Sequence, residues 1–338
     1  MSLYNESGFL NWPYIRGLGA PITLVIGGRG IGKTYGKLED SIVNQNKFLF
    51  MRRTKTQVDT TMTSELSVFK QLNEDHDWAI YSKGLSRVPG FYNIYKEDSG
   101  EPIGHAAPLS TFSNMRGFGS DAVEMILDEF IPELTEKKIR DEGNAILNAY
   151  ETVARNRELK GQDPLRFYAL SNSNELGAPL LMALGLVGKV ERMKRKGQEL
   201  TVLDDRGIAI ILPKADLIRE RKAETALYRA TKGTQFYGMA IENDFSEIDD
   251  LSVASKRLIE YVPVVQVGEL CIYRHKSAST YYVSEHVTGT PPTSFGSSEI
   301  ELRRFQAHNW YLWQAYLQNI ITFENSTCEV LFRKYWDS

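Results

Sequence analysis

The organisation of this chain follows from one motif, Ile22-Thr23-Leu24-Val25-Ile26-Gly27-Gly28-Arg29-Gly30-Ile31-Gly32-Lys33-Thr34. β-Branched and aliphatic residues lead into the pattern Gly-x4-Gly-Lys-Thr, which predicts a strand, a loop and then a helix. The glycines let the backbone turn tightly and aim successive N–H groups at one point. A helix that starts near Lys33 adds the positive end of its dipole there. The pattern therefore predicts a site for phosphate groups, and a chance glycine-rich turn is the alternative.

Each part of this loop has an expected task in binding a nucleoside triphosphate. The residues expected to surround the phosphates are Gly27, Gly28, Arg29, Gly30, Ile31, Gly32, Lys33 and Thr34. We expect the Lys33 ammonium to reach the β- and γ-phosphates and the Thr34 hydroxyl to hold Mg²⁺. The remaining sequence must then indicate what the bound nucleotide is used for.

Length and composition limit the classes of protein that this chain can belong to. Its 338 residues are enough for two domains. With 42% apolar and 25% charged residues, the composition is that of a soluble globular protein. The longest apolar run, near Pro179–Val187, is too short to cross a bilayer, and the N-terminus does not resemble a secretion signal. We therefore expect no membrane partner.

Two further totals bear on metals and on nucleic acid. Cys271 and Cys328 are the only cysteines, which argues against a disulfide framework or a cysteine-based metal site and fits a reducing cytosol. The formal net charge is −3. A protein of this charge that handles DNA must do so through local basic patches.

Trp12, Pro13 and Tyr14 stand just ahead of the first predicted strand. They could form a lead-in that stacks on a nucleotide base, or a segment that packs on the core. We favour packing.

A second apolar strand, Lys47–Met51, ends in the basic run Arg52-Arg53-Thr54-Lys55. Open α/β sheets place ligand-facing groups at the ends of their strands. These side chains could therefore contact phosphate in their own subunit or across an interface. A solvated turn is an equally open interpretation. In residues 56–121, short strand-like pieces separated by Gly and Pro predict a small antiparallel insertion or edge ribbon.

An apolar strand at Ala122–Glu129 ends in two adjacent carboxylates, Asp128 and Glu129. At the end of a strand beside the phosphate loop, Asp128 can orient Mg²⁺ and its waters. Glu129 points differently and can accept a proton from an attacking water. Many strands end in acids, but the complete phosphate loop upstream favours the catalytic interpretation. The adjacent pair also indicates the ASCE class of phosphate-loop NTPases, in which an extra strand separates the loop strand from the acid strand.

A helical pattern over Lys137–Glu158 ends in Arg155-Asn156-Arg157. Such arginines are candidates for a finger that a neighbouring subunit inserts toward the γ-phosphate. A favourable contact with the helix dipole is the alternative. The next strand, Leu165–Leu170, leads to Asn172, which could sense the γ-phosphate or simply form a turn. Four strands of parallel type with helices between them predict a doubly wound α/β domain that ends near residue 190.

The rest of the chain predicts a connector and a smaller α+β domain. Glu191–Glu199 is basic, and Arg219, Arg221 and Lys222 lie on a polar helix, which suits either a nucleic acid backbone or a solvated linker. Consecutive strands are expected at Val262–Val267, Glu269–His275 and Thr280–His286. Two helices opened by capping boxes at Ser298 and Ser326 follow. Their aromatic residues favour a core over a binding platform.

In combination, these motifs resemble the DNA-packaging motor ATPase family of small podophages, of the Bacillus phage type. The matching stretches are Val25–Thr34, Phe50–Arg53, Ile126–Phe130, Val153–Glu158, Leu170–Asn172, Phe236–Gly238 and Leu331–Lys334, so the similarity spans nearly the whole chain. The phosphate loop is common to many families. The Arg-Asn-Arg-Glu segment and the order of the motifs are more specific.

The resemblance implies a homopentameric ring at the portal, or connector, of an empty prohead in the host cytoplasm, which translocates double-stranded DNA with ATP and Mg²⁺. By motif match, Arg155 takes the role of a finger that acts in trans, and Lys55 is a second candidate across the interface. From the patterns along the chain we expect an ATPase domain at 1–197, a linker at 198–228 and a second domain at 229–338. The sequence does not decide whether a packaging RNA takes part.

The second domain of the family is similar to an RNase H-like nuclease that has lost its catalytic acids. Here the stretch Cys271–Lys276 ends in Arg274-His275-Lys276, where a two-metal nuclease needs a carboxylate. Acids such as Glu242, Asp244 and Glu285 form no evident constellation. A terminase that also cuts DNA and a ring module that binds nucleotide without turnover are the rival functions.

Overall fold

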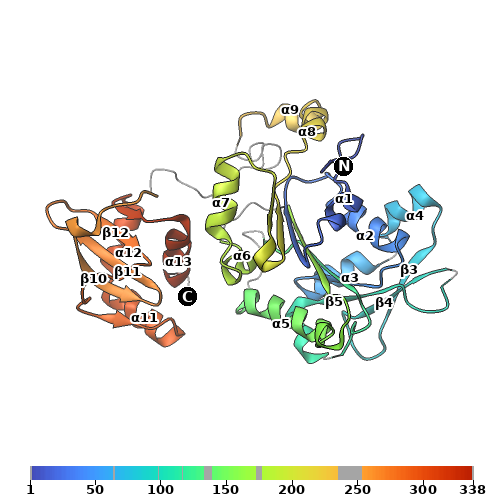
Figure 1. The fold of residues 1–338 in the computed structure, drawn as a ribbon, viewed down its shortest axis with the longest axis horizontal. Coiled ribbons are helices and arrows are strands. Elements are labelled where there is room, and N and C mark those ends of the chain that lie inside the picture. Colours follow the sequence, from blue (N-terminus) through green and yellow to red (C-terminus); the bar gives the residue numbers. More distant parts are fainter. Residues whose placement is uncertain are drawn as a thin grey trace. The chain divides into compact units, whose positions relative to one another are not determined.

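The computed structural model describes residues 2–63, 65–97, 99–115, 117–132, 139–172, 177–234 and 253–336. The chain divides into two compact units (Figure 1). Unit 1 comprises Met1–Leu184 and Met193–Ser246, and unit 2 comprises Gly185–Arg192 and Glu247–Ser338. The motif Phe236–Gly238 and the acids Glu242 and Asp244 lie outside the described residues. No helix in the described ranges combines the length and apolar character that a membrane span requires.

Unit 1 is built on a nine-stranded sheet, counted over its described residues, with the order β3-β4-β5-β2-β6-β7-β1-β9-β8. The strands are β1 (Ile22–Ile26), β2 (Phe48–Arg52), β3 (Ile80–Gly84), β4 (Tyr92–Lys96), β5 (Gly104–Pro108), β6 (Glu124–Asp128), β7 (Arg166–Ser171), β8 (Leu200–Leu203) and β9 (Ile208–Ile211). The six neighbouring strands β5-β2-β6-β7-β1-β9 all pair in parallel. Strand β7 lies between β1 and β6, which confirms the predicted extra strand between the loop strand and the acid strand.

The two edges of the sheet are antiparallel. Strands β3 and β4 pair antiparallel with each other, and β4 pairs antiparallel with β5, which confirms the predicted edge ribbon within residues 56–121. At the other edge β8 runs antiparallel to β9. Part of the range expected as a linker, 198–228, lies in this sheet, since β9 pairs with β1 and all four of its residues are buried.

Helices cover both faces of this sheet, as a doubly wound fold requires. The helices of unit 1 are α1 (Trp12–Gly17), α2 (Lys33–Val43), α3 (Lys55–Met62), α4 (Lys70–His76), α5 (Glu142–Ala154), α6 (Pro179–Ala183), α8 (Asp216–Ala223) and α9 (Ala226–Ala230), with short 3₁₀ turns η1 (Leu109–Asn114), η2 (Glu158–Lys160) and η3 (Asp204–Arg206). Helix α7 (Val187–Arg195) is divided between the two units. Residues of α1 to α4 and α8 share one apolar core with Val25, Phe50 and Ile126. Tyr150 of α5 contacts Phe167 on the opposite face, and Figure 1 shows α5 across the strands from α1 and α2.

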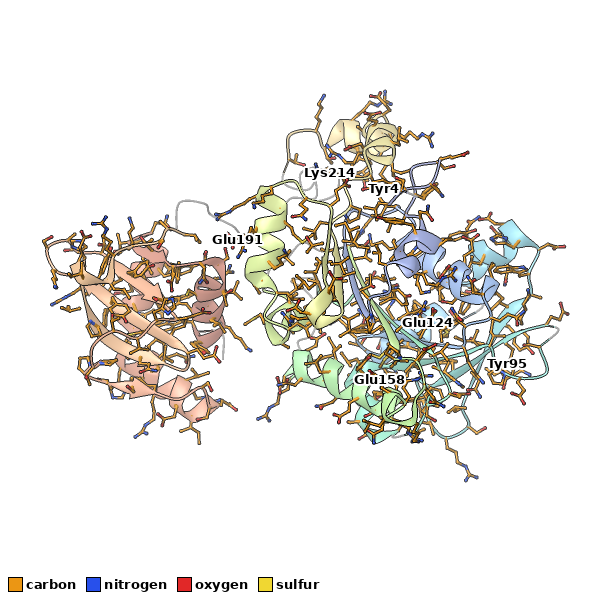
Figure 2. All side chains as sticks on the ribbon, in the orientation of Figure 1. Tyr4, Tyr95, Glu124, Glu158, Glu191 and Lys214 are labelled. Carbon is orange, nitrogen blue, oxygen red and sulfur yellow. The ribbon has the colours of Figure 1, made fainter. Side chains whose placement is uncertain are left out.

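A buried ionic network joins α2 to β6. Lys37 is fully buried, and its ammonium lies 2.9 Å from Glu124 Oε2 and 3.0 Å from Asp40 Oδ2. The Ser41 hydroxyl donates to the same Glu124 oxygen at 2.6 Å, and Asn46 donates to the other at 3.0 Å. Figure 2 labels Glu124 within the interior of unit 1. The acid that interrupts the apolar strand is therefore a paired group that fixes helix and strand together.

Unit 2 holds a five-stranded sheet, again counted over described residues, in the order β13-β10-β11-β12-β14. Its elements are β10 (Tyr261–Val267), β11 (Leu270–His275), β12 (Tyr281–Ser284), β13 (Ser294–Phe295), β14 (Ile321–Phe323), η5 (Leu258–Glu260), α11 (Glu299–His308), α12 (Trp310–Leu317) and α13 (Ser326–Trp336). The three consecutive strands were predicted and form an antiparallel meander. The short strands β13 and β14, which pair in parallel with β10 and β12, were not predicted.

The predicted helix caps of unit 2 are half correct. Ser298 caps α11, since its hydroxyl accepts a hydrogen bond from Glu301 N at 3.4 Å. The cap at Ser326 is wrong, because the Asn325 side chain accepts from Cys328 N at 2.9 Å and Ser326 is the first helical residue. The one helix expected to open at Ser298 is two helices, α11 and α12, which are separated at Asn309. Phe305 lies in the core as expected, whereas Trp310 is half exposed.

Trp12 supports the helix that follows the phosphate loop. It is buried, its Nε1 donates to the carbonyl oxygen of Gly32 at 2.9 Å, and its ring packs edge-on against Tyr168 at 5.8 Å. This confirms packing on the core as its role. A Cβ atom on Gly36 would lie 2.5 Å from Trp12 Cδ1. The glycine inside α2 is therefore required by the close approach of the indole.

We predict that Gly36→Ala destabilises unit 1 by about 1–3 kcal/mol, because the methyl group must displace a buried indole. The matched control is Gly17→Ala at the end of α1, where a Cβ would meet nothing within 4 Å. That change removes freedom from the unfolded chain and should be neutral or stabilising by up to about 1 kcal/mol. Differential scanning calorimetry of both variants measures this contrast, and equal midpoints would contradict it.

Candidate nucleotide-binding site

The phosphate loop connects the end of β1 to the start of α2, as predicted. Gly30 and Gly32 have φ values of +74° and +81°. Residues other than glycine rarely adopt this left-handed backbone conformation. The amide of Gly27 donates to the carbonyl oxygen of Ser171 at 3.1 Å, which ties the loop to β7. The loop therefore lies at the carboxyl edge of the parallel strands, where open α/β sheets bind ligands.

Lys33 is buried at the base of this loop. Only 5% of the residue is exposed, and its ammonium donates to the carbonyl oxygens of Gly27, at 2.7 Å, and Gly28. Burial lowers the pKa of Lys33 to about 7, although the nearby Asp128 carboxylate favours the charged form. An anion placed in the loop would restore the charge of this ammonium.

Thr34 and Asp128 meet across the sheet edge. The Thr34 hydroxyl donates to Asp128 Oδ1 at 2.9 Å, although the two residues are 94 positions apart. A hydroxyl and a carboxylate are oxygen ligands of the kind that Mg²⁺ takes from proteins, with the other positions filled by phosphates and water. Within the described ranges, no group of three or more His, Cys, Asp and Glu side chains could hold a metal ion by itself. The pair therefore suits a metal that arrives with a nucleotide.

Glu129 is turned away from the strand that precedes it. Its φ is +58°, a left-handed conformation that costs a non-glycine residue roughly 1–3 kcal/mol. The next amide, Phe130 N, donates to Leu170 O at 3.1 Å, so the turn is held against β7. About a third of the Glu129 side chain is exposed, compared with 5% for Asp128. The two adjacent carboxylates therefore differ in their exposure to solvent, with Glu129 the more accessible.

Arg52 and Arg53 do not form a solvated turn. Arg52 Nη2 lies 2.8 Å from Asp128 Oδ2, and Nη1 of the same guanidinium pairs with Glu129. Arg53 is fully buried and pairs with Glu142 through two bonds, one of them 2.9 Å from Nη2 to Oε2. Arg52 therefore orients both acids of the site, and Arg53 fixes the start of α5 to the carboxyl edge. Neither pairing was predicted from the sequence.

Lys55 begins α3, after a capping box at Thr54. Its ammonium lies 3.6 Å from Asp59 one turn later, and about half of its side chain is exposed. Asn172 follows Ser171 at the end of β7, between β1 and β6 in the sheet. Asn172 is thus beside the phosphate loop, and Lys55 is on the same edge of the sheet but farther along it.

Arg155 lies near the amino ends of the parallel strands, opposite the end that carries the phosphate loop. Helix α5 begins at Glu142, beside Arg53, and its 13 residues carry the chain back toward the amino ends of the strands. Just beyond it, Arg157 Nη1 donates to the carbonyl oxygen of Ala122, which precedes β6. A helix of this length spans about 20 Å. Arg155 is exposed and lies against Gly117, so the structure does not bring it to the phosphate loop of its own chain.

Two residues that the sequence did not indicate flank the loop. Phe9 lies against Gly32, where a Cβ would be 3.4 Å from the Phe9 Cβ. Lys222 of α8 donates a hydrogen bond to the carbonyl oxygen of Arg29. Neither contact has a local signal, because both depend on how distant segments pack. The contact of Trp12 with α2 did have a local signal. Gly36 lies inside that helix, and a glycine within a helix often marks the close approach of another group.

Two solved structures share the fold of the whole chain. One is described as the bacteriophage Phi-29 viral genome packaging motor assembly: TM-score 0.67, 22% identity, covering 97% of this chain and 99% of that one. The other is described as the Phi-28 gp11 DNA packaging motor: TM-score 0.64, 17% identity, covering 98% of this chain and 97% of that one. Among curated proteins, none matches this sequence.

A family model supplies the assignment that these distant structures do not. The model described as podovirus DNA encapsidation protein (Gp16) matches residues 5–286, which include the phosphate loop, both acids and the β10–β12 meander. This range is well over half of the chain. The chain therefore belongs to the podovirus DNA encapsidation protein (Gp16) family.

Proposed function

We propose that this protein hydrolyses ATP with Mg²⁺ and couples the hydrolysis to translocation of double-stranded DNA into a viral prohead. The observation that carries the proposal is the meeting of Lys33, Thr34, Asp128 and Glu129 at one edge of the sheet. Membership of a DNA encapsidation family supplies the task that hydrolysis serves.

The proposed chemistry divides among these residues by their geometry. The loop amides and the buried Lys33 ammonium bind the phosphates, and Thr34 with Asp128 would hold Mg²⁺, which neutralises phosphate charge when bound. Glu129 accepts the proton of the attacking water. Arg52 orients both carboxylates through its two ion pairs. Asn172, which follows the end of β7, senses the γ-phosphate.

The proposed assembly is a ring, with Arg155 acting on a neighbouring subunit. The length and direction of α5 keep this arginine away from its own phosphate loop, which favours action in another copy. Lys55 is a second candidate for such a contact. Following the family resemblance, we propose that the ring has five subunits. It binds the portal or connector vertex of the prohead in the host cytoplasm. A packaging RNA is a further partner to be tested.

We do not propose nuclease activity. Strand β11 ends at His275, preceded by Arg274 and followed by Lys276, and cations there would repel the metal ions that a two-metal nuclease needs. Incubation of supercoiled plasmid with Mg²⁺ or Mn²⁺ tests this, and metal-dependent nicking would favour a terminase that also cuts DNA.

Removal of the Lys33 ammonium should abolish catalysis. We expect Lys33→Ala to reduce DNA-stimulated phosphate release by at least about 100-fold, because the charge that meets the β- and γ-phosphates is lost. Lys70→Ala, which removes an exposed lysine of α4, is the matched control. A Lys33→Ala protein with the hydrolysis rate of the unaltered chain would overturn the site assignment.

ATP binding should take up a proton at alkaline pH. The pKa of Lys33 is lowered to about 7 by burial. Bound phosphates raise this pKa, so binding adds about one proton between pH 7 and the ordinary pKa of lysine, and affinity falls as the pH rises above 7. Titration calorimetry at pH 8.5 in buffers of different ionisation enthalpy measures this uptake. The Lys33→Arg protein should show no such proton uptake, because the guanidinium is already protonated before ATP binds. Equal proton uptake in both proteins would refute the linkage to Lys33.

Mixed rings test whether Arg155 acts in trans. Arg155→Ala and Glu129→Gln should each be inactive alone, since an arginine finger contributes about 10³–10⁵ in rate. In a one-to-one mixture, about a quarter of head-to-tail interfaces pair an intact Glu129 with an intact Arg155. We expect hydrolysis to recover to roughly that fraction. No recovery in mixed assemblies would mean that Arg155 acts in its own chain or is structural.

A further inference from the structure

Lys222, near the end of α8, lies directly on the phosphate loop. Its ammonium donates to the carbonyl oxygen of Arg29, 193 positions earlier in the chain. A Cβ atom placed on Gly30 would lie 3.0 Å from the same nitrogen. Sequence patterns placed this lysine only on a polar helix, so the contact is a product of the fold.

The position of α8 is set by the N-terminal segment. The Tyr4 hydroxyl accepts a hydrogen bond at 3.0 Å from the amide of Ala215, the residue before α8, and Figure 2 shows Tyr4 beside Lys214. A Cβ on Gly8 would lie 2.9 Å from the Leu217 Cβ, and Ile218 is buried in the core of unit 1. The helix that carries Lys222 is therefore held at its start and along its buried face.

Positive charge accumulates where this helix meets the loop. Burial lowers the pKa of Lys222, and the Arg29 guanidinium lowers it further; Lys222 and Arg29 in turn contribute to the lowered pKa of Lys33. Three cations placed so close together oppose one another. A polyphosphate between them would turn that repulsion into attraction.

We propose that Lys222 is a further cationic contact for the phosphates of the bound nucleotide, supplied by the same chain. This inference rests on the proposed function. An ammonium carries three donor hydrogens, so the bond to Arg29 leaves two that can turn toward phosphate oxygens. A compact, charged donor of this kind forms strong hydrogen bonds with phosphate. Helix α8, formerly expected within a linker, then becomes part of the nucleotide site.

Binding measurements with two ligands test the proposal. The variant is Lys222→Met, which keeps the packing of the side-chain stem and removes the charge. We expect ATP and inorganic tripolyphosphate to bind about ten- to a hundredfold more weakly, the effect of losing one charge-assisted hydrogen bond. Lys222→Arg should retain most of the affinity. Arg221→Ala, an exposed neighbour on α8, is the matched control and should bind as the unaltered chain does.

The other outcomes separate this inference from the proposed function. Unchanged binding of both ligands to a folded Lys222→Met, with binding lost in Lys33→Ala, would overturn the inference and leave the proposed function intact. Weaker ATP binding with unchanged tripolyphosphate binding would also overturn it, because the lysine would then contact the base or ribose. Normal ATP binding by Lys33→Ala would instead remove the proposed function, and this inference with it.

Discussion

The site is organised around the burial of the Lys33 ammonium. A cation with 5% exposure is held by two carbonyl oxygens of its own loop, and burial lowers its pKa to about 7. Removing an ammonium from water costs free energy, and carbonyl oxygens offset that cost only in part. A polyanion in the loop offsets it more fully. The buried charge of Lys33 therefore costs free energy in the empty loop, and the same charge favours the binding of phosphate.

This arrangement depends on two elements, α2 and β6, which are joined to each other by a contact outside the loop. Helix α2 begins at Lys33, and strand β6 ends at Asp128. The Lys37–Glu124 ion pair at 2.9 Å joins them one turn into the helix and at the first residue of the strand. Trp12 packs against the same helix, beside Gly36 and near the Lys37 ammonium. The 2.9 Å contact between Thr34 and Asp128 is thus maintained by packing as well as by its own hydrogen bond.

The sequence predicted those parts of the site that depend on neighbours in the chain. The loop, the acid pair at the end of β6 and the strand between β1 and β6 follow from local patterns of apolar residues, glycines and acids. Pairings between distant segments escaped it. Arg52 meets Asp128 and Glu129, Lys222 meets Arg29, and β9 joins β1, in each case because of tertiary packing. Asn325 displaced Ser326 as a cap by a shift of one residue, which is within the usual uncertainty of helix ends.

The distribution of cations over the two edges of the sheet bears on how the protein assembles. Lys33, Arg52 and Lys222 all lie at the carboxyl ends of the parallel strands, in contact with the phosphate loop or the acid pair of their own chain. Arg155 follows a helix that runs about 20 Å back to the amino edge. An arginine there reaches a γ-phosphate only in a second copy whose carboxyl edge faces it. Such a contact joins two different surfaces, so it repeats head to tail and closes into a ring when the rotation allows. If Arg155 is catalytic, one chain alone holds an incomplete site, and assembly supplies its last charge.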